Sequence, residues 1–122
     1  MPTVMVVDDD RATVNLLTML LEMDGFQVSQ SPKPQPALEM ARAGTVDAFV
    51  IDCHLGPNNG LDLVRNIRLD QNLVDKLVIV TSGKDLSQEA MDAGADLFIL
   101  KPFSPNGLSA KLAEFLSHPR EA

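Results

Sequence analysis

Five short runs of apolar and β-branched residues alternate along the chain with segments of helical periodicity. This alternation constrains the fold more than any other feature of the sequence. Runs of this length indicate strands, and a wholly apolar run indicates a strand buried on both faces of a sheet. The five predicted strands are Thr3–Val7, Phe26–Ser29, Ala48–Ile51, Leu77–Val80 and Leu97–Leu100. Strands that alternate with helices predict an α/β fold with a parallel sheet, right-handed crossovers and helices on both faces.

Five helices are expected, one after each strand. Asp10 is a suitable N-cap for the first helix. The apolar stripe of that helix is Val14, Leu17 and Leu21, and Leu16, Leu20 and Met23 are expected to widen it. Such a stripe, with i, i+3 and i+7 spacing, predicts one face packed against the sheet.

The second helix is expected to follow a stiff loop over residues 31–36, because three prolines there exclude a helix interior. It would begin near Pro36 and end at about Ala43. Residues 57–60 are expected to form a loop. The third helix is expected to carry Leu61, Val64 and Ile67 on one face. The fourth is expected to span about 86–93, and the fifth to begin with Ser104 as N-cap and Pro105 as its first residue.

The composition predicts one globular domain. The chain has 122 residues, 45% of them apolar, which suits a single domain over 1–122 with 117–122 as a tail or the start of a linker. The net charge of −7 argues against nucleic-acid binding by this domain, since phosphate attraction needs a basic face. No apolar run approaches the ~20 residues of a membrane span, so no membrane insertion is expected. Cys53 is the single cysteine and lacks an internal disulfide partner, which favours a cytoplasmic location and an inert, partly buried thiol.

Polar residues follow four of the five predicted strands. Asp8 and Asp9 follow the first, Asp52 the third, Thr81 the fourth and Lys101 the fifth. We expect the flavodoxin-like doubly wound strand order 2-1-3-4-5, in which functional groups gather where the order reverses, between strands one and three. These five side chains are therefore expected at one edge of the sheet.

The crowding of carboxylates at this edge points to a bound cation. Asp8, Asp9 and Asp52 would repel one another, and a hard divalent ion with oxygen ligands, Mg²⁺, would relieve that repulsion. Thr81 adds a hydroxyl donor and Lys101 an ammonium group. A metal, a carboxylate nucleophile, a lysine and a hydroxyl donor are the groups needed for phosphoryl transfer.

Each of these residues also has an ordinary structural explanation when it is taken alone. Residues 8–10 could be an acidic turn that caps a helix, Thr81 a strand-end hydroxyl and Lys101 a surface lysine. Their occurrence together at the ends of successive strands favours a site. Other polar and aromatic residues have structural expectations only: exposed positions without catalytic role for His54 and His118, and core positions for Phe98 and Phe103.

Four stretches of the chain resemble the receiver domain of bacterial response regulators. They are VMVVDDD at 4–10, FVIDCHL at 49–55 with Gly60 eight residues after Asp52, VIVTSG at 78–83, and AGADLFILKPF at 93–103. The order and spacing of the four stretches are highly specific to that family. The resemblance covers about residues 3–116.

The resemblance implies that Asp52 accepts a phosphoryl group from a sensor histidine kinase or a phosphotransfer protein. It implies that Mg²⁺ is held by Asp8, Asp9, Asp52 and the backbone carbonyl of His54. The chain would be no enzyme beyond self-phosphorylation and autodephosphorylation.

The resemblance also implies a switch. Thr81 and Lys101 would contact the phosphoryl oxygens, and the Lys101–Pro102 bond would be cis. On phosphorylation Thr81 would move towards the phosphoryl group and Phe98 would fill the space it leaves. The face formed by the fourth helix, the fifth strand and the fifth helix would then bind an output protein or domain, or a second copy of the chain in a homodimer.

The sequence departs from the family pattern at three positions. Gly56 stands where the family often has proline, Phe98 where a tyrosine is common, and Leu97 where the DNA-binding subclass usually carries an acid. The residues at the positions of His54 and Gly83 tune the phosphoryl lifetime in the family.

Two other functions compete with a phosphorylated receiver. A haloacid-dehalogenase-like, Mg²⁺-dependent phosphatase would use Asp8 as nucleophile, Asp10 two residues later, and Thr81 at the end of a strand. Ala12 stands where that class usually has threonine, no acidic pair follows Lys101, and Asp52 would have no role. The other alternative is a pseudo-receiver, an interaction module that is not phosphorylated.

Overall fold

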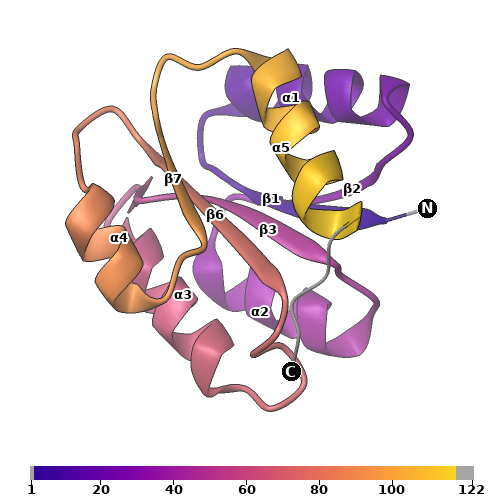
Figure 1. Cartoon of the computed structure of the whole chain (residues 1–122). Coiled ribbons are helices and arrows are strands. Elements are labelled where there is room, and N and C mark those ends of the chain that lie inside the picture. The colour runs from indigo at the N-terminus through magenta and orange to yellow at the C-terminus, as the bar shows by residue number, and fades with distance from the viewer. Residues whose placement is uncertain (1, 118–122) are drawn as a thin grey trace.

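A five-stranded parallel sheet forms the centre of the molecule (Figure 1). The computed structural model describes residues 2–117. The strand order is β2-β1-β3-β6-β7. Because β4 and β5 form a separate hairpin, β6 and β7 are the fourth and fifth predicted strands, and the predicted order 2-1-3-4-5 is confirmed. The strands are β1 (Thr3–Val7), β2 (Gln27–Ser31), β3 (Ala48–Asp52), β6 (Leu77–Ser82) and β7 (Leu97–Leu100).

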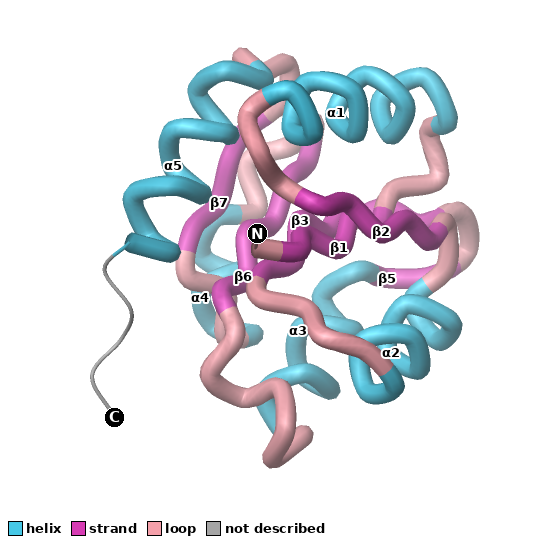
Figure 2. Tube along the Cα trace, turned by 90° about the vertical axis from the view of Figure 1, so that its right-hand side faces the viewer, coloured by secondary structure: helices cyan, strands magenta, loops and turns pink. Residues whose placement is uncertain are grey.

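Five helices cover the two faces of this sheet, as predicted (Figures 1 and 2). The helices are α1 (Arg11–Met23), α2 (Pro34–Ala43), α3 (Gly60–Leu69), α4 (Ser87–Ala93) and α5 (Pro105–Ser117). Helices α1 and α5 lie on one face, and α2, α3 and α4 lie on the other. His118 and the rest of the expected 117–122 tail, apart from Ser117, lie outside the described residues.

The alternation of side chains along β1 divides the core into two clusters. Val4 and Val6 pack in the cluster beneath α1 and α5, whereas Met5 and Val7 pack in the cluster beneath α2, α3 and α4. Successive residues of a strand point to opposite faces, so a strand with two buried faces must be apolar throughout. This is why the short apolar runs predicted the central strands well.

Several boundaries differ from the prediction. Strand β3 ends at Asp52 rather than Ile51, and β6 ends at Ser82 rather than Val80, so Asp52 and Thr81 are the last or next-to-last residues of their strands. Helix α2 begins at Pro34 rather than near Pro36, with proline in its first turn. The first N–H groups of a helix have no partner within it, so prolines at its start cost nothing in hydrogen bonding. Strand β2 runs over 27–31 instead of 26–29, because its polar residues pair with β1 at the edge of the sheet.

The apolar stripe of α1 is narrower than predicted. Val14, Leu17 and Leu21 are buried, but Leu16 is 47% exposed and Met23 is 75% exposed. The sheet covers a single face of the helix, so Leu16 and Met23 beyond the i, i+3, i+7 row point to solvent, whereas Leu20 is half-buried. None of the helices within the described residues is long and apolar enough to cross a membrane.

The segment predicted as a loop after β3 contains a small hairpin. Strand β4 (His54–Leu55) pairs antiparallel with β5 (Asn58–Asn59). Gly60, predicted within the loop, is already the first residue of α3, and Asn59 caps that helix by accepting a hydrogen bond from the Leu61 N–H at 2.9 Å.

Candidate functional site

Three carboxylates meet where the carboxyl ends of β1 and β3 lie side by side. Val7, the last residue of β1, pairs with Ile51 of β3, which brings Asp8 and Asp52 to the same edge. One carboxylate oxygen from each of Asp8, Asp9 and Asp52 lies within 4.8 Å of the other two. Asp8 and Asp52 are buried and Asp9 is exposed. The sequence prediction that these side chains come together is confirmed.

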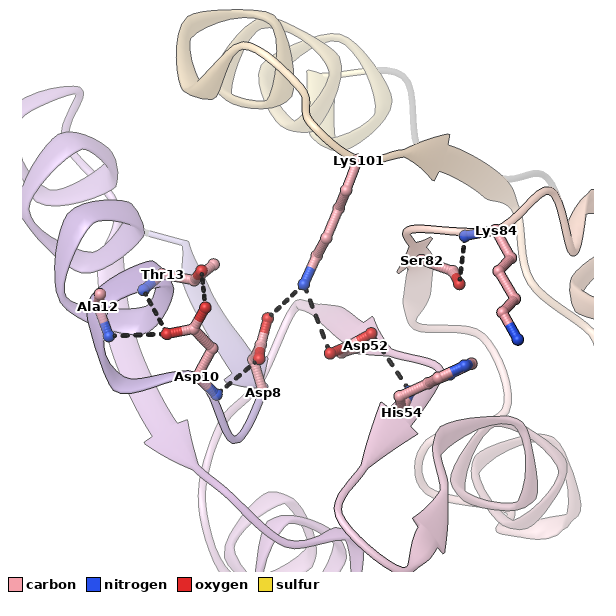
Figure 3. A network of polar contacts seen from close by, with 9 residues as sticks. All are labelled: Asp8, Asp10, Ala12, Thr13, Asp52, His54, Ser82, Lys84 and Lys101. Carbon is pink, nitrogen blue, oxygen red and sulfur yellow. Dashed lines mark hydrogen bonds and ion pairs between the residues drawn. The ribbon is translucent and has the colours of Figure 1, made fainter.

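Lys101 reaches into this cluster from the end of β7 (Figure 3). Its Nζ donates a hydrogen bond to Asp8 Oδ2 at 3.0 Å and lies 3.4 Å from Asp52 Oδ2. The Lys101 side chain is 25% exposed, so solvent screens these ion pairs only in part. The Lys101–Pro102 peptide bond that follows is cis, the isomer expected.

The electrostatics of the cluster shift two pKa values. Burial and the neighbouring Asp8 carboxylate raise the pKa of Asp52 above its ordinary value, although the His54 N–H and Lys101 oppose the shift. Burial alone would lower the pKa of Lys101, but its hydrogen bond to Asp8 and the attraction of both carboxylates raise it. A cation near the carboxylates therefore stabilises the charged form of the site.

Asp10 points away from the cluster and caps α1. Its carboxylate accepts hydrogen bonds from the Ala12 N–H at 3.1 Å and from the Thr13 hydroxyl at 2.9 Å. The N-cap prediction is confirmed. The phosphatase alternative needs Asp8 and Asp10 at one reacting centre, and this arrangement does not supply it.

Thr81 lies opposite Asp52 in the register of β3 and β6, so the hydroxyl predicted for the site comes from the neighbouring strand. Thr81 is buried, and within residues 2–117 its hydroxyl makes no hydrogen bond. Ser82 is also buried, and its hydroxyl accepts a hydrogen bond from the Lys84 N–H at 3.1 Å. Phe98 of β7 is partly buried and packs against the core cluster beneath α2, α3 and α4.

The backbone around Asp52 is fixed by groups that the sequence prediction did not single out. The His54 N–H donates to Asp52 Oδ1 at 3.2 Å, and the Cys53 N–H donates to the Thr81 carbonyl at 2.9 Å. The His54 side chain is exposed, as expected. Cys53 is buried, and burial together with Asp52 raises the pKa of its thiol to about 11, so it stays protonated at neutral pH.

The donor set fits a hard divalent cation. Oxygen ligands are what Mg²⁺ prefers, and Asp8, Asp9 and Asp52 supply three carboxylates against the one ammonium of Lys101. Asp9 is the exposed member of the three, and no hydrogen bond to its carboxylate exists among the described residues. It is therefore available as a ligand without breaking an existing contact.

Known proteins are similar to this chain in both sequence and fold. The family model described as the response regulator receiver domain matches residues 4–113. The phosphate regulon transcriptional regulatory protein PhoB of Pseudomonas aeruginosa is 30% identical over 117 residues, which are 93% of this chain and 51% of PhoB. The chain thus spans about half the length of the curated relatives that it matches.

Solved structures give the same result. A response regulator from Thermotoga maritima has a TM-score of 0.83 and 35% identity, covering 96% of this chain and 98% of that one. The response regulator TrrA from the same organism, in complex with Mg²⁺-BeF, has a TM-score of 0.82 and 24% identity, over 93% and 98% of the two chains; this likeness concerns the fold alone. The strand order, the acidic cluster beside Lys101 and the family match over most of the chain agree: this protein belongs to the response regulator receiver domain family of two-component signalling.

Proposed function

We propose that Asp52 is the phosphoacceptor of this receiver domain and that a sensor histidine kinase or phosphotransfer protein is the donor. The observation that carries the proposal is the position of Asp52, buried at the end of β3 between a lysine and two further carboxylates. Such an environment is typical of a reacting carboxylate rather than a solvated one. The chain would act as a substrate of the kinase, and its own chemistry would be limited to self-phosphorylation and autodephosphorylation.

In the proposed reaction an Asp52 carboxylate oxygen attacks the phosphorus of a phosphohistidine. The new O–P bond forms as the N–P bond breaks, and the electron pair of that bond leaves with the imidazole. Lys101, already 3.4 Å from Asp52, would pair with a phosphoryl oxygen and offset the added negative charge. The Thr81 hydroxyl, which has no hydrogen bond within the part of the chain described, would donate to another phosphoryl oxygen.

Asp8, Asp9, Asp52 and the His54 backbone carbonyl would hold Mg²⁺, which would supply positive charge against the phosphoryl oxygens. Support for this ion comes from the three carboxylates of this chain. Together they carry more negative charge than the Lys101 ammonium paired with Asp8 and Asp52 offsets.

The proposed output is a switch at the face formed by α4, β7 and α5. Thr81 would move towards the phosphoryl group, and Phe98, which lies one strand away, would occupy the space vacated. Charge-assisted hydrogen bonds of ~1.5–3 kcal/mol each could supply the ~5.5 kcal/mol needed to take a switch from 1:99 to 99:1. The partner would be an output domain, another protein or a second copy of the chain, with no nucleic acid bound by this domain itself. The buried free thiol of Cys53 favours a cytoplasmic location.

The test uses a small phosphodonor, phosphoramidate with Mg²⁺, and peptide mass spectrometry to locate the phosphoryl group. We expect modification of the peptide that holds Asp52 and its loss in Asp52→Asn. Asp8→Asn should slow the reaction but leave the modified residue unchanged. Undiminished phosphorylation of Asp52→Asn would overturn the proposal, and a phosphoryl group on Asp8 would support the phosphatase alternative. A wild-type chain that accepts no phosphoryl group would support the pseudo-receiver.

A further inference from the structure

The hairpin that follows Asp52 turns in a way that a proline at position 56 could not. The β4–β5 pairing of His54 with Asn59 and Leu55 with Asn58 leaves Gly56 and Pro57 as a two-residue turn. Gly56 has φ +62°, a conformation that L-residues rarely adopt. Proline fixes φ near −65°, which excludes a type I′ turn and leaves type II′, with glycine at the first turn position.

The base of this hairpin is hydrogen-bonded to β6, the strand beside the one that ends in Asp52, and to the start of α3. The Cys53 N–H donates to the Thr81 carbonyl at 2.9 Å, and the Gly60 N–H donates to the Cys53 carbonyl at 2.8 Å. Leu55 is 2% exposed and anchors the hairpin in the core. The course of the backbone between Asp52 and α3 therefore depends on how the turn closes.

The tip of the hairpin lies against the acidic cluster. A Cβ built on Gly56 would lie 3.6 Å from Asp9 Oδ2, the distance of an ordinary van der Waals contact. Asp9 has no hydrogen bond among residues 2–117 that would hold its carboxylate. The turn thus lies within contact distance of Asp9, the exposed carboxylate of the cluster, and limits the space open to its side chain.

We propose that the Gly56–Pro57 turn positions the ligands of the Mg²⁺ site. Its left-handed glycine fixes the path of the His54 backbone, whose carbonyl is one proposed ligand, and limits the positions open to the Asp9 carboxylate, another. The inference rests on the proposed function, in which the acidic cluster holds Mg²⁺. Gly56 is a positioning residue, since it acts through His54 and Asp9.

The test measures Mg²⁺ affinity of the unphosphorylated chain by titration calorimetry, together with thermal unfolding without metal. Gly56→Ala should weaken Mg²⁺ binding about three- to tenfold. A positive φ strains alanine, and part of that strain would displace the backbone and side chains proposed as Mg²⁺ ligands. Gly56→Asn should bind Mg²⁺ within about twofold of wild type, because asparagine, like glycine, is accepted at the positive-φ position of a type II′ turn. The matched control is Gly25→Ala: Gly25 has φ +96° and no neighbouring atom within 4 Å of a built Cβ, and it lies at the far end of α1 from the site.

Gly25→Ala is expected to lose thermal stability while keeping its Mg²⁺ affinity. The inference is overturned if Gly56→Ala binds Mg²⁺ like wild type, if Gly56→Asn is weakened as much as Gly56→Ala, or if Gly25→Ala loses affinity to the same extent. A wild-type chain that binds no Mg²⁺ would contradict the proposed metal site itself. Wild-type binding with an unaffected Gly56→Ala would contradict this inference alone.

Discussion

Gly60 packs so closely on Asp52 that a Cβ at position 60 would overlap the Asp52 carbonyl oxygen. The first turn of α3 thus rests on the backbone of the proposed phosphoacceptor, with the Gly60 N–H bonded to the Cys53 carbonyl at 2.8 Å. The position of the Asp52 carboxylate is set by backbone packing as well as by its ion pair with Lys101. Only a residue without a side chain permits this approach.

Gly60→Ala is expected to destabilise the protein by about 1–3 kcal/mol, because the Cβ must displace the backbone of β3 or α3. It should also slow the phosphorylation of Asp52. The control is Gly83→Ala, where a built Cβ meets no atom within 4 Å, and its stability should lie within about 0.5 kcal/mol of wild type. Urea unfolding measures the difference, and equal stability of the two variants would show that the backbone adapts to the added methyl group.

A second prediction concerns Arg68, which lies near the amino ends of β6 and β7, whereas the site lies at the carboxyl ends of the strands. Its guanidinium donates to the carbonyls of Gly94, Val74 and Lys76, each at 2.8 Å, and to Asp96 Oδ2 at 3.0 Å. Gly94 ends α4 with φ +116°, and a Cβ at this position would lie 2.6 Å from Arg68 Cγ. The absence of a side chain at position 94 therefore leaves room for the Arg68 side chain.

Arg68→Ala is expected to cost about 3–5 kcal/mol, because it removes the ion pair with Asp96 and the hydrogen bonds to three backbone carbonyls. The Arg68 and Asp96 side chains are 16% and 13% exposed, so little of this ion pair is screened. The control on the same helix is Arg65→Ala, whose pair with Asp62 is 51% and 69% exposed and should contribute less than about 1 kcal/mol. Equal unfolding midpoints in urea for the two variants would contradict the prediction.

The fold was predictable from the sequence because burial on both faces leaves a strong signal. The runs that end in Val7 and Leu100 match β1 and β7 residue for residue, since β1 lies between Pro2 and Asp8 and β7 between Asp96 and Lys101. Strand β2 lies at the edge of the sheet, where polar residues such as Gln27 and Ser29 can reach solvent. It lacks the apolar run of a buried strand, so the predicted bounds of 26–29 differ from the observed 27–31. The predicted start of α2, near Pro36, is late because prolines argue against a helix interior, whereas Pro34 occupies a first turn that needs no N–H.

The acidic cluster was predictable from topology alone, since strand order determines which ends meet. The β4–β5 hairpin was not, because a strand of two residues gives almost no periodic signal. One signal was available: Gly56 before Pro57, flanked by Leu55, is compatible with a type II′ hairpin turn. The contact between Gly60 and Asp52 depends on how closely α3 approaches β3, and that distance cannot be read from residue types.

Asp52→Asn is expected to stabilise the metal-free protein at neutral pH. The folded state raises the pKa of Asp52, through burial and then the Asp8 carboxylate, so it disfavours the ionised form. The loss of folding stability caused by the ionised Asp52 carboxylate is therefore present in full at pH values above the folded pKa. It disappears as the pH falls below the unfolded pKa of about 3.9. Thermal unfolding should give the variant the higher midpoint at pH 7, with the difference shrinking on acidification. Saturating Mg²⁺ should remove or reverse the advantage, and a variant that is less stable without metal at pH 7 would show that Lys101 outweighs burial.

The last prediction concerns the face formed by α4, β7 and α5, where β7 is the free edge of the sheet (Figure 1). The apolar residues of β7 are not equally available to a partner. Leu97 and Ile99 pack against the cluster beneath α1 and α5, whereas Leu100 is 51% exposed. Met91 of α4 is 47% exposed. Leu100 is therefore a better probe of an apolar contact than Leu97, whose substitution would also disturb the core.

We expect the phosphorylated chain to self-associate through this face, and Leu100→Asp to weaken that association at least about tenfold, the effect of removing a central apolar contact. The matched control is Leu69→Asp, which adds the same charge at an 82% exposed leucine at the end of α3. Both variants should still accept the phosphoryl group at Asp52, because neither residue belongs to the site. Sedimentation velocity of the phosphorylated chains measures the association. If the two variants associate equally, the contact lies on another face; if phosphorylated wild type stays monomeric, the face serves a different partner and the expected homodimer is wrong.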